Sequence, residues 1–400
     1  VMGVFRGFFQ GRGNMIPTSV SQIIEQLVHA GVSIWASYDF LNRFADRDNP
    51  LSYGAAGGTL GTLIGALAAF AFLGAMMVLY YKGRKKKRPQ PCSMDYRQVM
   101  VLLLATFTPI ILSQFVYQLS GSVDNSLFGL IMDGKGFSEK ERLSLLGIYG
   151  GKYRLLTNVP VAIASSLGAS MIPSIVVSRV AKRPKEVRHK IYITIKFNML
   201  IAIPCAVAMF ALASPVMRLV FGDGREITRN LLMLGASAVV FFSLSTVTNS
   251  VLQGIDLMRK SVTHSAISLG IHAVLVWLML SKLNLGVYGL VVGNVTFALV
   301  VCILNWIAIG KALHYRQEVR SSFIGPLFCS CLMGICAFAV YHGLYWLIPS
   351  NTLGMCAAAV VGAAVYGAAI LKLRVVSKRE LQEMPMGRLL LKFGRLLHLI

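Results

Sequence analysis

The sequence predicts an all-α polytopic membrane protein, and three features lead to this fold class. First, 56% of the 400 residues are hydrophobic, only 14% are charged, and the mean hydropathy is +0.66. A soluble domain of this size needs more polar residues to cover its surface. Second, apolar stretches of about 20 residues, which cross a ~30 Å hydrocarbon core as helices, recur along the chain. Third, basic residues concentrate on alternate loops, as they do in membrane proteins.

Ten stretches are long and apolar enough to be membrane-spanning helices. They lie at residues 15–36, 55–81, 99–131, 144–178, 190–213, 227–252, 261–281, 286–309, 322–348 and 353–374. The third and fourth are long enough to tilt or to project beyond the bilayer. Ahead of the first, Phe5, Phe8 and Phe9 end another apolar segment, and a Gly-rich turn at residues 11–14 separates the two.

The charge distribution predicts which loops face the cytoplasm. One set of alternate loops carries 27 Lys or Arg, whereas the opposite set carries nine, together with eight acidic residues. By the positive-inside rule the first set is cytoplasmic. The net charge of +23 therefore reflects topology, and we expect no nucleic-acid binding. The basic run at 82–88 and an amphipathic tail from Ser377 are expected to lie on anionic lipids of the inner leaflet.

An internal repeat suggests how the chain is organised. Leu252-Gln253-Gly254 follows Phe9-Gln10-Gly11 by 243 residues, and each triplet precedes a predicted turn between spans. Parallel repeats about an axis along the membrane normal would place both turns on one side. Because the sequence starts with Val and half a hydrophobic segment, we interpret it as a fragment that lacks about 145 N-terminal residues. The expected parts are the remainder of an N-terminal lobe (1–90), a six-helix C-terminal lobe (91–320), two additional helices (321–376) and a cytoplasmic tail (377–400).

Several polar side chains fall inside predicted spans, where burial is costly. In the third span, Gln118 and Asn125 share a helix face, and Asp124 lies next to it. Two interpretations stay open, a hydrogen-bonding stripe between helices or near the outer leaflet, and the lining of a cavity. Glu25 is the single carboxylate of the first span, and Lys196 is expected to snorkel to the cytoplasmic boundary.

Lys152 and Arg154 lie near the outer boundary of the fourth span. One interpretation is that both side chains only snorkel into the headgroups. The alternative is phosphate binding, because a guanidinium group matches phosphate oxygens bidentately.

Small residues and potential metal ligands have simpler interpretations. Glycines at three- and four-residue spacing in the second span predict close helix packing, with a sliding surface as the alternative: Gly54, Gly57, Gly58, Gly61 and Gly65. His264 and His272 lie two helical turns apart without a carboxylate at matching spacing, so we expect no metal site there. Cys329 and Cys331 lack a second ligand pair, and we expect no metal and no cofactor.

Three sequence segments resemble a known transporter group. They are RGFFQG (residues 6–11), PTSVSQIIEQ (17–26) and IYGGKYRLLTNVPVAIASSLGASMIPSI (148–175). They are similar to the polysaccharide-exporter branch of the multidrug/oligosaccharidyl-lipid/polysaccharide flippase superfamily, and more narrowly to the MurJ-type and stage V sporulation protein B group. The resemblance implies two six-helix lobes around a central cationic cavity and two further C-terminal spans, fourteen in all. The ten spans predicted here would be spans five to fourteen.

The resemblance also implies a function. We expect a monomeric, multi-pass flippase of the bacterial cell membrane that moves lipid II or a related undecaprenyl-diphosphate oligosaccharide by alternating access, driven by a coupling ion or the membrane potential. The alternative is a drug/cation antiporter of the same superfamily, with Glu25 and Asp124 as ion sites. An intramembrane enzyme is not expected, because the outer loops lack paired carboxylates or a metal cluster. The candidate substrate-binding residues are Arg6, Glu25, Gln118, Asp124, Asn125, Lys152 and Arg154.

Overall fold

The computed structural model describes residues 2–12, 14–47, 49–82, 95–377 and 380. It divides into two compact units, Val1–Asp95 and Tyr96–Ile400, which we treat separately. Every regular element of the described residues is a helix, so the predicted fold class is confirmed. The basic run at 83–88 and the tail at 381–400 lie outside the described residues, and so do the expectations for them.

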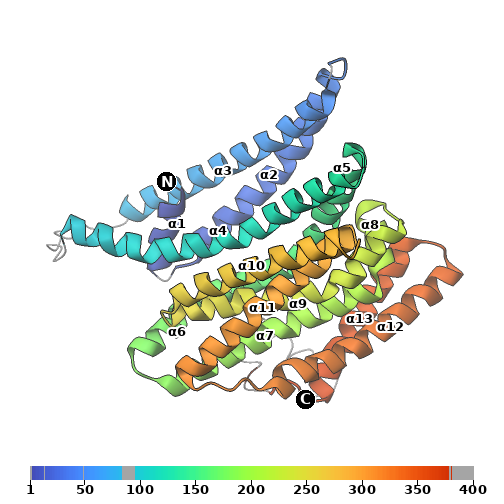
Figure 1. Ribbon diagram of the computed structural model, residues 1–400. Coiled ribbons are helices and arrows are strands. Elements are labelled where there is room, and N and C mark those ends of the chain that lie inside the picture. Colours follow the sequence, from blue (N-terminus) through green and yellow to red (C-terminus); the bar gives the residue numbers. More distant parts are fainter. Residues whose placement is uncertain (1, 13, 48, 83–94, 378–379, 381–400) are drawn as a thin grey trace. The chain divides into compact units, whose positions relative to one another are not determined.

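The first unit consists of three helices (Figure 1): α1 (Met2–Gly11), α2 (Ile16–Arg43) and α3 (Pro50–Lys82). α2 and α3 form an antiparallel hairpin whose backbones approach closely along the predicted glycine stripe. A Cβ added to Gly57 would lie 2.5 Å from the carbonyl oxygen of Ala36, and one added to Gly61 would lie 2.0 Å from Ser33 Oγ. Only glycine leaves room for such contacts, which confirms the packing interpretation of the stripe.

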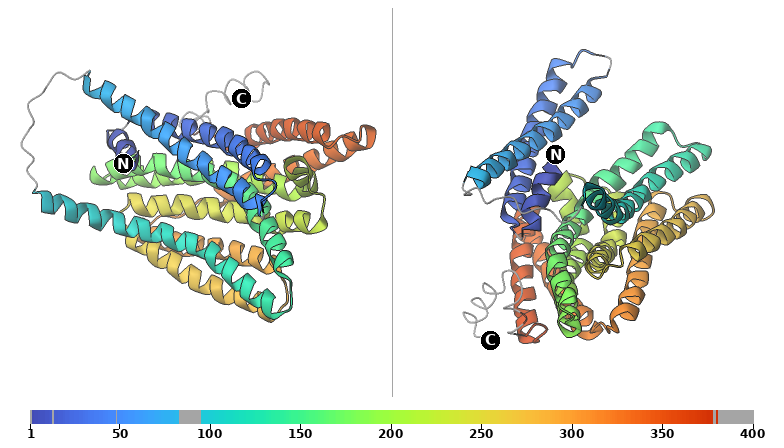
Figure 2. Two further views of the ribbon diagram at one scale, coloured as in Figure 1. Left: turned by 90° about the horizontal axis from the view of Figure 1, so that it is seen from above. Right: turned by 90° about the vertical axis from the view of Figure 1, so that its left-hand side faces the viewer.

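The second unit is a larger bundle with α9 at its centre (Figure 2). α9 packs against α6, α7 and α11, and its apolar side chains are buried on several sides. The elements are α4 (Tyr96–Gly134), α5 (Glu139–Ile148), the π-helix η1 (Tyr149–Arg154), α6 (Leu155–Val180), α7 (Pro184–Ala211), α8 (Ala213–Phe221), α9 (Glu226–Gly254), α10 (Met258–Ser281), α11 (Val287–Leu313), the π-helix η2 (Arg320–Ile324), α12 (Gly325–Leu347) and α13 (Asn351–Lys372).

Nine helices of the described residues are long and apolar enough to cross a membrane. They coincide with the second to the tenth predicted spans, and the third and fourth are the longest, at 39 and 42 residues. The first predicted span, 15–36, lies within α2 except for Met15, which precedes the helix. That helix has 28 residues, which is sufficient length, but Glu25 and His29 make it less apolar than the others.

Both members of the internal repeat lie where one helix ends and the next begins. α1 ends at Gly11 and α2 begins at Ile16, while α9 ends at Gly254 and α10 begins at Met258. Each repeated Gln-Gly pair therefore ends a helix and leads into a short turn before the next one.

Long-range contacts in the second unit group its turns at two ends. At one end, Lys135 donates hydrogen bonds to the carbonyl of Leu280 and to Asn284, so the α4–α5 and α10–α11 turns are neighbours. At the other end, Tyr192 near the start of α7 lies 2.9 Å from Ser321 of η2 through their hydroxyl oxygens. This grouping agrees with the alternation of predicted outer and cytoplasmic loops.

Lys196 does not snorkel to water as the sequence suggested. Its side chain is 2% exposed, and its Nζ donates to Glu380 Oε1 at 2.8 Å and to the hydroxyl of Tyr192 at 3.0 Å. Glu380 also accepts from the Ser377 backbone N–H at 2.7 Å, while Ser377 Oγ accepts from the Glu380 N–H, which together form a capping box. Burial raises the pKa of Glu380, but the bonds from Lys196 and Ser377 outweigh it and hold that pKa below its usual value.

We expect Glu380→Gln to lower the free energy of unfolding by about 3 kcal/mol, because it leaves the Lys196 ammonium buried without a carboxylate. The wild-type contribution should be complete above about pH 4.3, the usual pKa of glutamate, and be lost as the pH falls through the lowered folded-state pKa. Denaturant unfolding of the detergent-solubilised protein measures both. Glu318→Gln is the control, since Glu318 is exposed and forms no ion pair with the described residues. Equal stability of the two variants would contradict the role of Glu380.

The loop scheme makes a second prediction. In a cysteine-free background, single cysteines at Arg183 and Arg316 should react only with reagents on the cytoplasmic side, and those at Asp46 and Lys140 only with reagents outside. All four positions are exposed, so failure to label would not result from burial. If any one of the four cysteines is labelled from the side opposite to the predicted one, the predicted alternation of cytoplasmic and outer loops is wrong.

Candidate substrate-binding cleft

The YGGKYR motif forms the π-helix η1, between α5 and α6. A π-helical turn contains an extra residue relative to an α-helical turn, and such turns occur frequently at functional sites. Here it sends the rings of Tyr149 and Tyr153 into the bundle, where both are buried. Lys152 and Arg154 are half-buried. Lys152 points toward the α8–α9 loop, where it pairs with Asp223, and Arg154 lines a cleft.

A polar cleft of about 490 Å³ opens beside η1, between α4, α6 and α9. Its walls supply amide and hydroxyl groups, one cation and few large apolar side chains. The polar residues that line it are Gln114, Tyr117, Gln118, Ser120, Arg154, Asn158, Ser165, Thr246, Asn249, Ser250 and Gln253.

Arg154 supplies the positive charge of this cleft. Its guanidinium group lies against Gly121 of α4, where an added Cβ would come within 2.6 Å of Nη1, and its Cζ lies 5.9 Å from the centre of the Tyr149 ring. Within the described parts of the chain it forms no ion pair with a carboxylate. Its charge is therefore available to an anion that enters the cleft.

The polar stripe predicted on α4 divides between three environments. Gln118 lines the cleft, whereas Asn125 is exposed and lies outside the lining. Asp124 has no exposed surface and points into the bundle, where Oδ2 accepts from the Tyr149 hydroxyl at 2.8 Å and Oδ1 lies 2.9 Å from His272 Nε2. Spacing within α10 could not indicate this partner of His272, because Asp124 lies on α4, 148 residues away in the sequence.

Lys152 belongs to a cluster at the end of the unit where the loop joins α8 to α9. It forms an ion pair with Asp223, which also accepts from Arg225 Nη2 at 2.7 Å and from Thr228 Oγ1 at 3.0 Å. The hydrogen bonds from Arg225, followed by those from Lys152 and Thr228, hold the pKa of Asp223 well below its usual value despite burial. Lys152 thus ties η1 to the α8–α9 loop, and its charge is already neutralised.

The two candidate residues of the first unit pair with each other. Arg6 Nη2 of α1 donates to Glu25 Oε2 of α2 at 2.7 Å, and its Nε donates to Ser21 Oγ at 3.1 Å. The Thr18 hydroxyl donates to the Arg6 carbonyl at 3.5 Å. These bonds hold α1 on α2, and both charged side chains remain partly exposed.

One group of site residues was not predicted from the sequence. The carboxamide of Asn249, which lines the cleft, donates to the Tyr117 hydroxyl at 2.8 Å and accepts from Asn305 Nδ2 at 2.8 Å and from Ser261 Oγ at 2.9 Å. His264 Nδ1 in turn lies 2.8 Å from Asn305 Oδ1. This network joins four helices, α4, α9, α10 and α11, so no periodicity within one helix could have indicated it.

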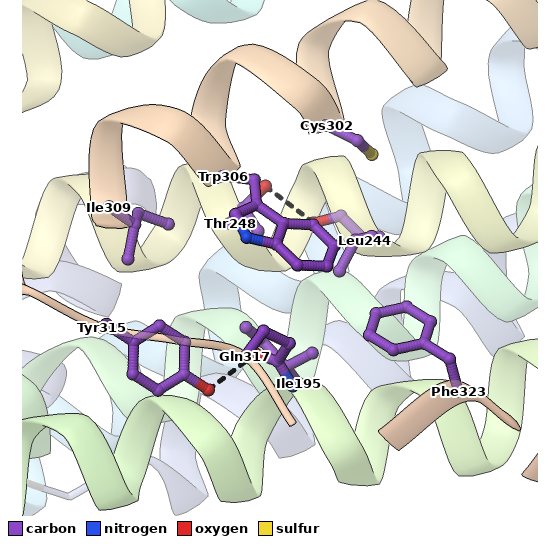
Figure 3. Close-up of a pocket in the computed structure, with 9 residues that line it drawn as sticks. All are labelled: Ile195, Leu244, Thr248, Cys302, Trp306, Ile309, Tyr315, Gln317 and Phe323. Atoms are coloured by element: carbon purple, nitrogen blue, oxygen red, sulfur yellow. Dashed lines mark hydrogen bonds between the residues drawn. The ribbon is translucent and has the colours of Figure 1, made fainter. Parts of the chain in front are cut away.

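Two other potential sites can be set aside. The connection between α11 and η2 covers an apolar hollow of about 20 Å³, lined by Trp306, Tyr315 and Phe323 among others (Figure 3). That volume holds roughly one water molecule, too little for a substrate. The described residues also contain no group of three or more His, Cys, Asp or Glu side chains arranged to hold a metal ion.

The chain matches two family models and is similar to several curated proteins of Bacillus subtilis. Residues 1–177 match the family model described as "Polysaccharide biosynthesis protein", and residues 109–278 match the MatE family model. Lipid II flippase MurJ of Bacillus subtilis (strain 168) is 26% identical over 388 residues, which cover 93% of this chain and 69% of MurJ. Stage V sporulation protein B of the same organism is 23% identical over 398 residues, which cover 98% of this chain and 74% of that protein.

A solved structure shares the fold. The structure of Lipid II flippase MurJ in an inward closed conformation matches with a TM-score of 0.58 at 13% sequence identity. The match covers 91% of this chain and 69% of that structure. The chain therefore shares the fold of that structure.

The Asp223 cluster makes a stability prediction. Asp223→Asn should lower the free energy of unfolding by about 1.5–3 kcal/mol, because the buried carboxylate that accepts from Lys152, Arg225 and Thr228 is lost. Asp133→Asn, at a carboxylate that is 66% exposed and paired with Arg142, should cost less than about 1 kcal/mol. Denaturant unfolding of the two variants compares them directly. Equal losses would show that the Asp223 cluster does not stabilise this end of the unit.

Proposed function

This chain is a multi-pass bacterial membrane protein homologous to the flippases MurJ and stage V sporulation protein B, and we propose that it translocates lipid II or a related undecaprenyl-diphosphate oligosaccharide by alternating access. Its homologues are transporters and not enzymes. The lipid-linked substrate is supported by this relationship and by the chemistry of the cleft in the second unit.

The observation that carries the proposal is the Arg154 guanidinium group. Charged groups inside membrane proteins are normally paired or face a functional pathway. Arg154 lines a polar cleft, has no carboxylate partner within the described residues and presents a planar donor group. A guanidinium can donate two parallel hydrogen bonds to adjacent oxygens of a diphosphate.

The rest of the cleft suits the sugar part of such a substrate. Gln114, Gln118 and Asn158 carry carboxamides that can both donate and accept hydrogen bonds with hydroxyl groups. Asn249 is held in one orientation by Tyr117, Ser261 and Asn305. In this proposal Lys152 does not contact the substrate but positions η1 through its ion pair with Asp223. Arg6 and Glu25 of the first unit remain candidate substrate-binding residues, as the sequence predicts.

A drug/cation antiporter is the second candidate, because the MatE model matches residues 109–278 and Asp124 is buried within a span. An antiporter for organic cations would present a carboxylate to its substrate. Asp124, however, is enclosed by Tyr149 and His272, and the described lining of the cleft includes a cation, Arg154, and no carboxylate. We therefore favour an anionic substrate, with a monomer in anionic lipid as the transporting species.

Arg154→Ala should reduce translocation of a fluorescent lipid-linked oligosaccharide in proteoliposomes by about 10- to 100-fold, as expected for loss of a charge-assisted contact of about 1.5–3 kcal/mol. Arg154→Lys should restore part of the rate, because it keeps the charge and loses the bidentate geometry. Folded abundance should not change. Wild-type rates in Arg154→Ala at equal abundance would refute the assignment.

Gly121 offers a subtler test of the same contact. Gly121→Ala should displace the Arg154 guanidinium by filling the space where Nη1 now lies, while leaving the helix at least as stable, since alanine favours helices. Transport should fall several-fold. Gly129→Ala is the matched control on the same helix, because an added Cβ there meets nothing within 4 Å. If both variants transport equally well, the position of the guanidinium against α4 is unimportant.

A further inference from the structure

We propose that a hollow at the predicted cytoplasmic end of the second unit binds the headgroup of an aminophospholipid, which carries both a phosphodiester and an ammonium group. The hollow has a volume of about 660 Å³ and is lined by η2, the start of α12 and the turn that follows α13. This volume lies within the roughly 300–1,000 Å³ of small-ligand sites. The hollow shares no lining residue with the substrate-binding cleft, so the proposal does not depend on what the protein transports.

Three charged side chains line the hollow, and their signs define the ligand. Arg320 and Arg374 carry guanidinium groups, and Glu318 carries a carboxylate. None of the three forms an ion pair within the parts of the chain that the structure describes. Guanidinium groups form strong, charge-assisted hydrogen bonds to the oxygens of a phosphodiester. The carboxylate can accept hydrogen bonds from the ammonium group of the same headgroup.

A headgroup with both charges matches this lining better than a headgroup with only a negative charge. An anionic phospholipid such as phosphatidylglycerol would engage the two arginines and would bring no positive charge to Glu318. Phosphatidylethanolamine brings a negative phosphate and a positive ammonium. Phosphatidylcholine has the same charges, but its quaternary ammonium has no N–H to donate to the carboxylate.

The hollow lies where two membrane spans end. One end of each of the spans Arg320–Leu347 and Asn351–Lys372 borders it, and the loop that precedes η2 is predicted to be cytoplasmic. Large apolar side chains of the lining are also exposed: Ile324 (57%), Phe328 (63%) and Leu373 (51%). Exposed apolar surface beside charged groups is suited to the membrane interface, with acyl chains on the apolar side and the headgroup on the charged side.

Local contacts fix the backbone on both sides of the hollow. Val375 packs onto Gly325, where an added Cβ would lie 3.0 Å from Val375 Cγ1. The chain leaves α13 through Arg374, whose φ of 50° lies in the left-handed region. On the opposite side, Gln317 Nε2 donates to Ser322 Oγ at 2.9 Å and so orders the segment before η2. A headgroup therefore does not have to order these segments when it binds, which favours affinity.

The first test removes the positive charges. Native mass spectrometry of the full chain measures the binding of dihexanoyl-phosphatidylethanolamine. We expect Arg320→Gln/Arg374→Gln to lower the affinity about 10-fold or more, because two charge-assisted contacts to the phosphate are lost. Arg316→Gln/Lys372→Gln is the matched control, since both side chains are exposed and lie outside the lining. Equal affinities of the two double variants would overturn the proposal.

The second test separates an aminophospholipid from an anionic one. Glu318→Gln should weaken the binding of dihexanoyl-phosphatidylethanolamine several-fold, because the ammonium loses its carboxylate. The same variant should strengthen the binding of dihexanoyl-phosphatidylglycerol, because a negative charge beside the phosphate is removed. The variant should leave dihexanoyl-phosphatidylcholine less affected than the ethanolamine lipid. A parallel change for all three lipids would show that the hollow does not recognise the ammonium, and would overturn the proposal.

A competition experiment separates a membrane lipid from a soluble phosphate compound. Phosphoethanolamine, which lacks acyl chains, should displace dihexanoyl-phosphatidylethanolamine only at much higher concentration, because it cannot contact the exposed apolar lining. Displacement at equal concentration would assign the hollow to a soluble ligand and would overturn the lipid assignment. The substituted side chains are all exposed, so the variants should unfold at the same temperature as the wild type.

Discussion

The cost of placing charge in an apolar slab governs the second unit. Each charged side chain that enters its helical bundle must find a partner, because bulk water cannot reach it. Lys196 finds Glu380, Lys152 finds Asp223, and Asp124 finds His272. These pairings join segments far apart in the sequence, so satisfying buried charge also fixes which helices are neighbours.

Arg154 stands out against this background. It has the same need for a counter-charge, yet the described residues supply no carboxylate that forms an ion pair with it. Its guanidinium group lies beside the ring of Tyr149, against Gly121 and in the lining of the cleft. Both neighbours allow a guanidinium to be held without being neutralised, since an aromatic ring stabilises a cation and a glycine leaves space beside the helix. The other buried charges form ion pairs, whereas the Arg154 guanidinium has no carboxylate partner among the described residues. Such a group is suited to bind and release an anionic substrate.

Composition and periodicity predicted much of the fold. The apolar stretches gave nine helices of membrane-spanning length, and the glycine spacing in α3 correctly indicated its close contact with α2. These features depend on residues near one another in the chain. α2 is less apolar than the other predicted spans because it carries Glu25, which pairs with Arg6 of the preceding helix.

The site was harder to predict because its interactions are long-range. The partners Asp124 and His272 are 148 residues apart, Lys152 and Asp223 are 71 apart, and Lys196 and Glu380 are 184 apart. The sequence singled out the YGGKYR motif but could not show that it winds as a π-helix.

That winding determines what each residue of the motif can do. Within six residues, η1 directs Tyr149 to the buried carboxylate, Lys152 to the Asp223 cluster and Arg154 to the cleft. A regular α-helix advances about 100° per residue and would give these side chains different relative directions. The π-helix therefore links a buried carboxylate, a fixed structural anchor and an open cation through one short segment. A local change in its winding is the smallest movement that could alter all three together.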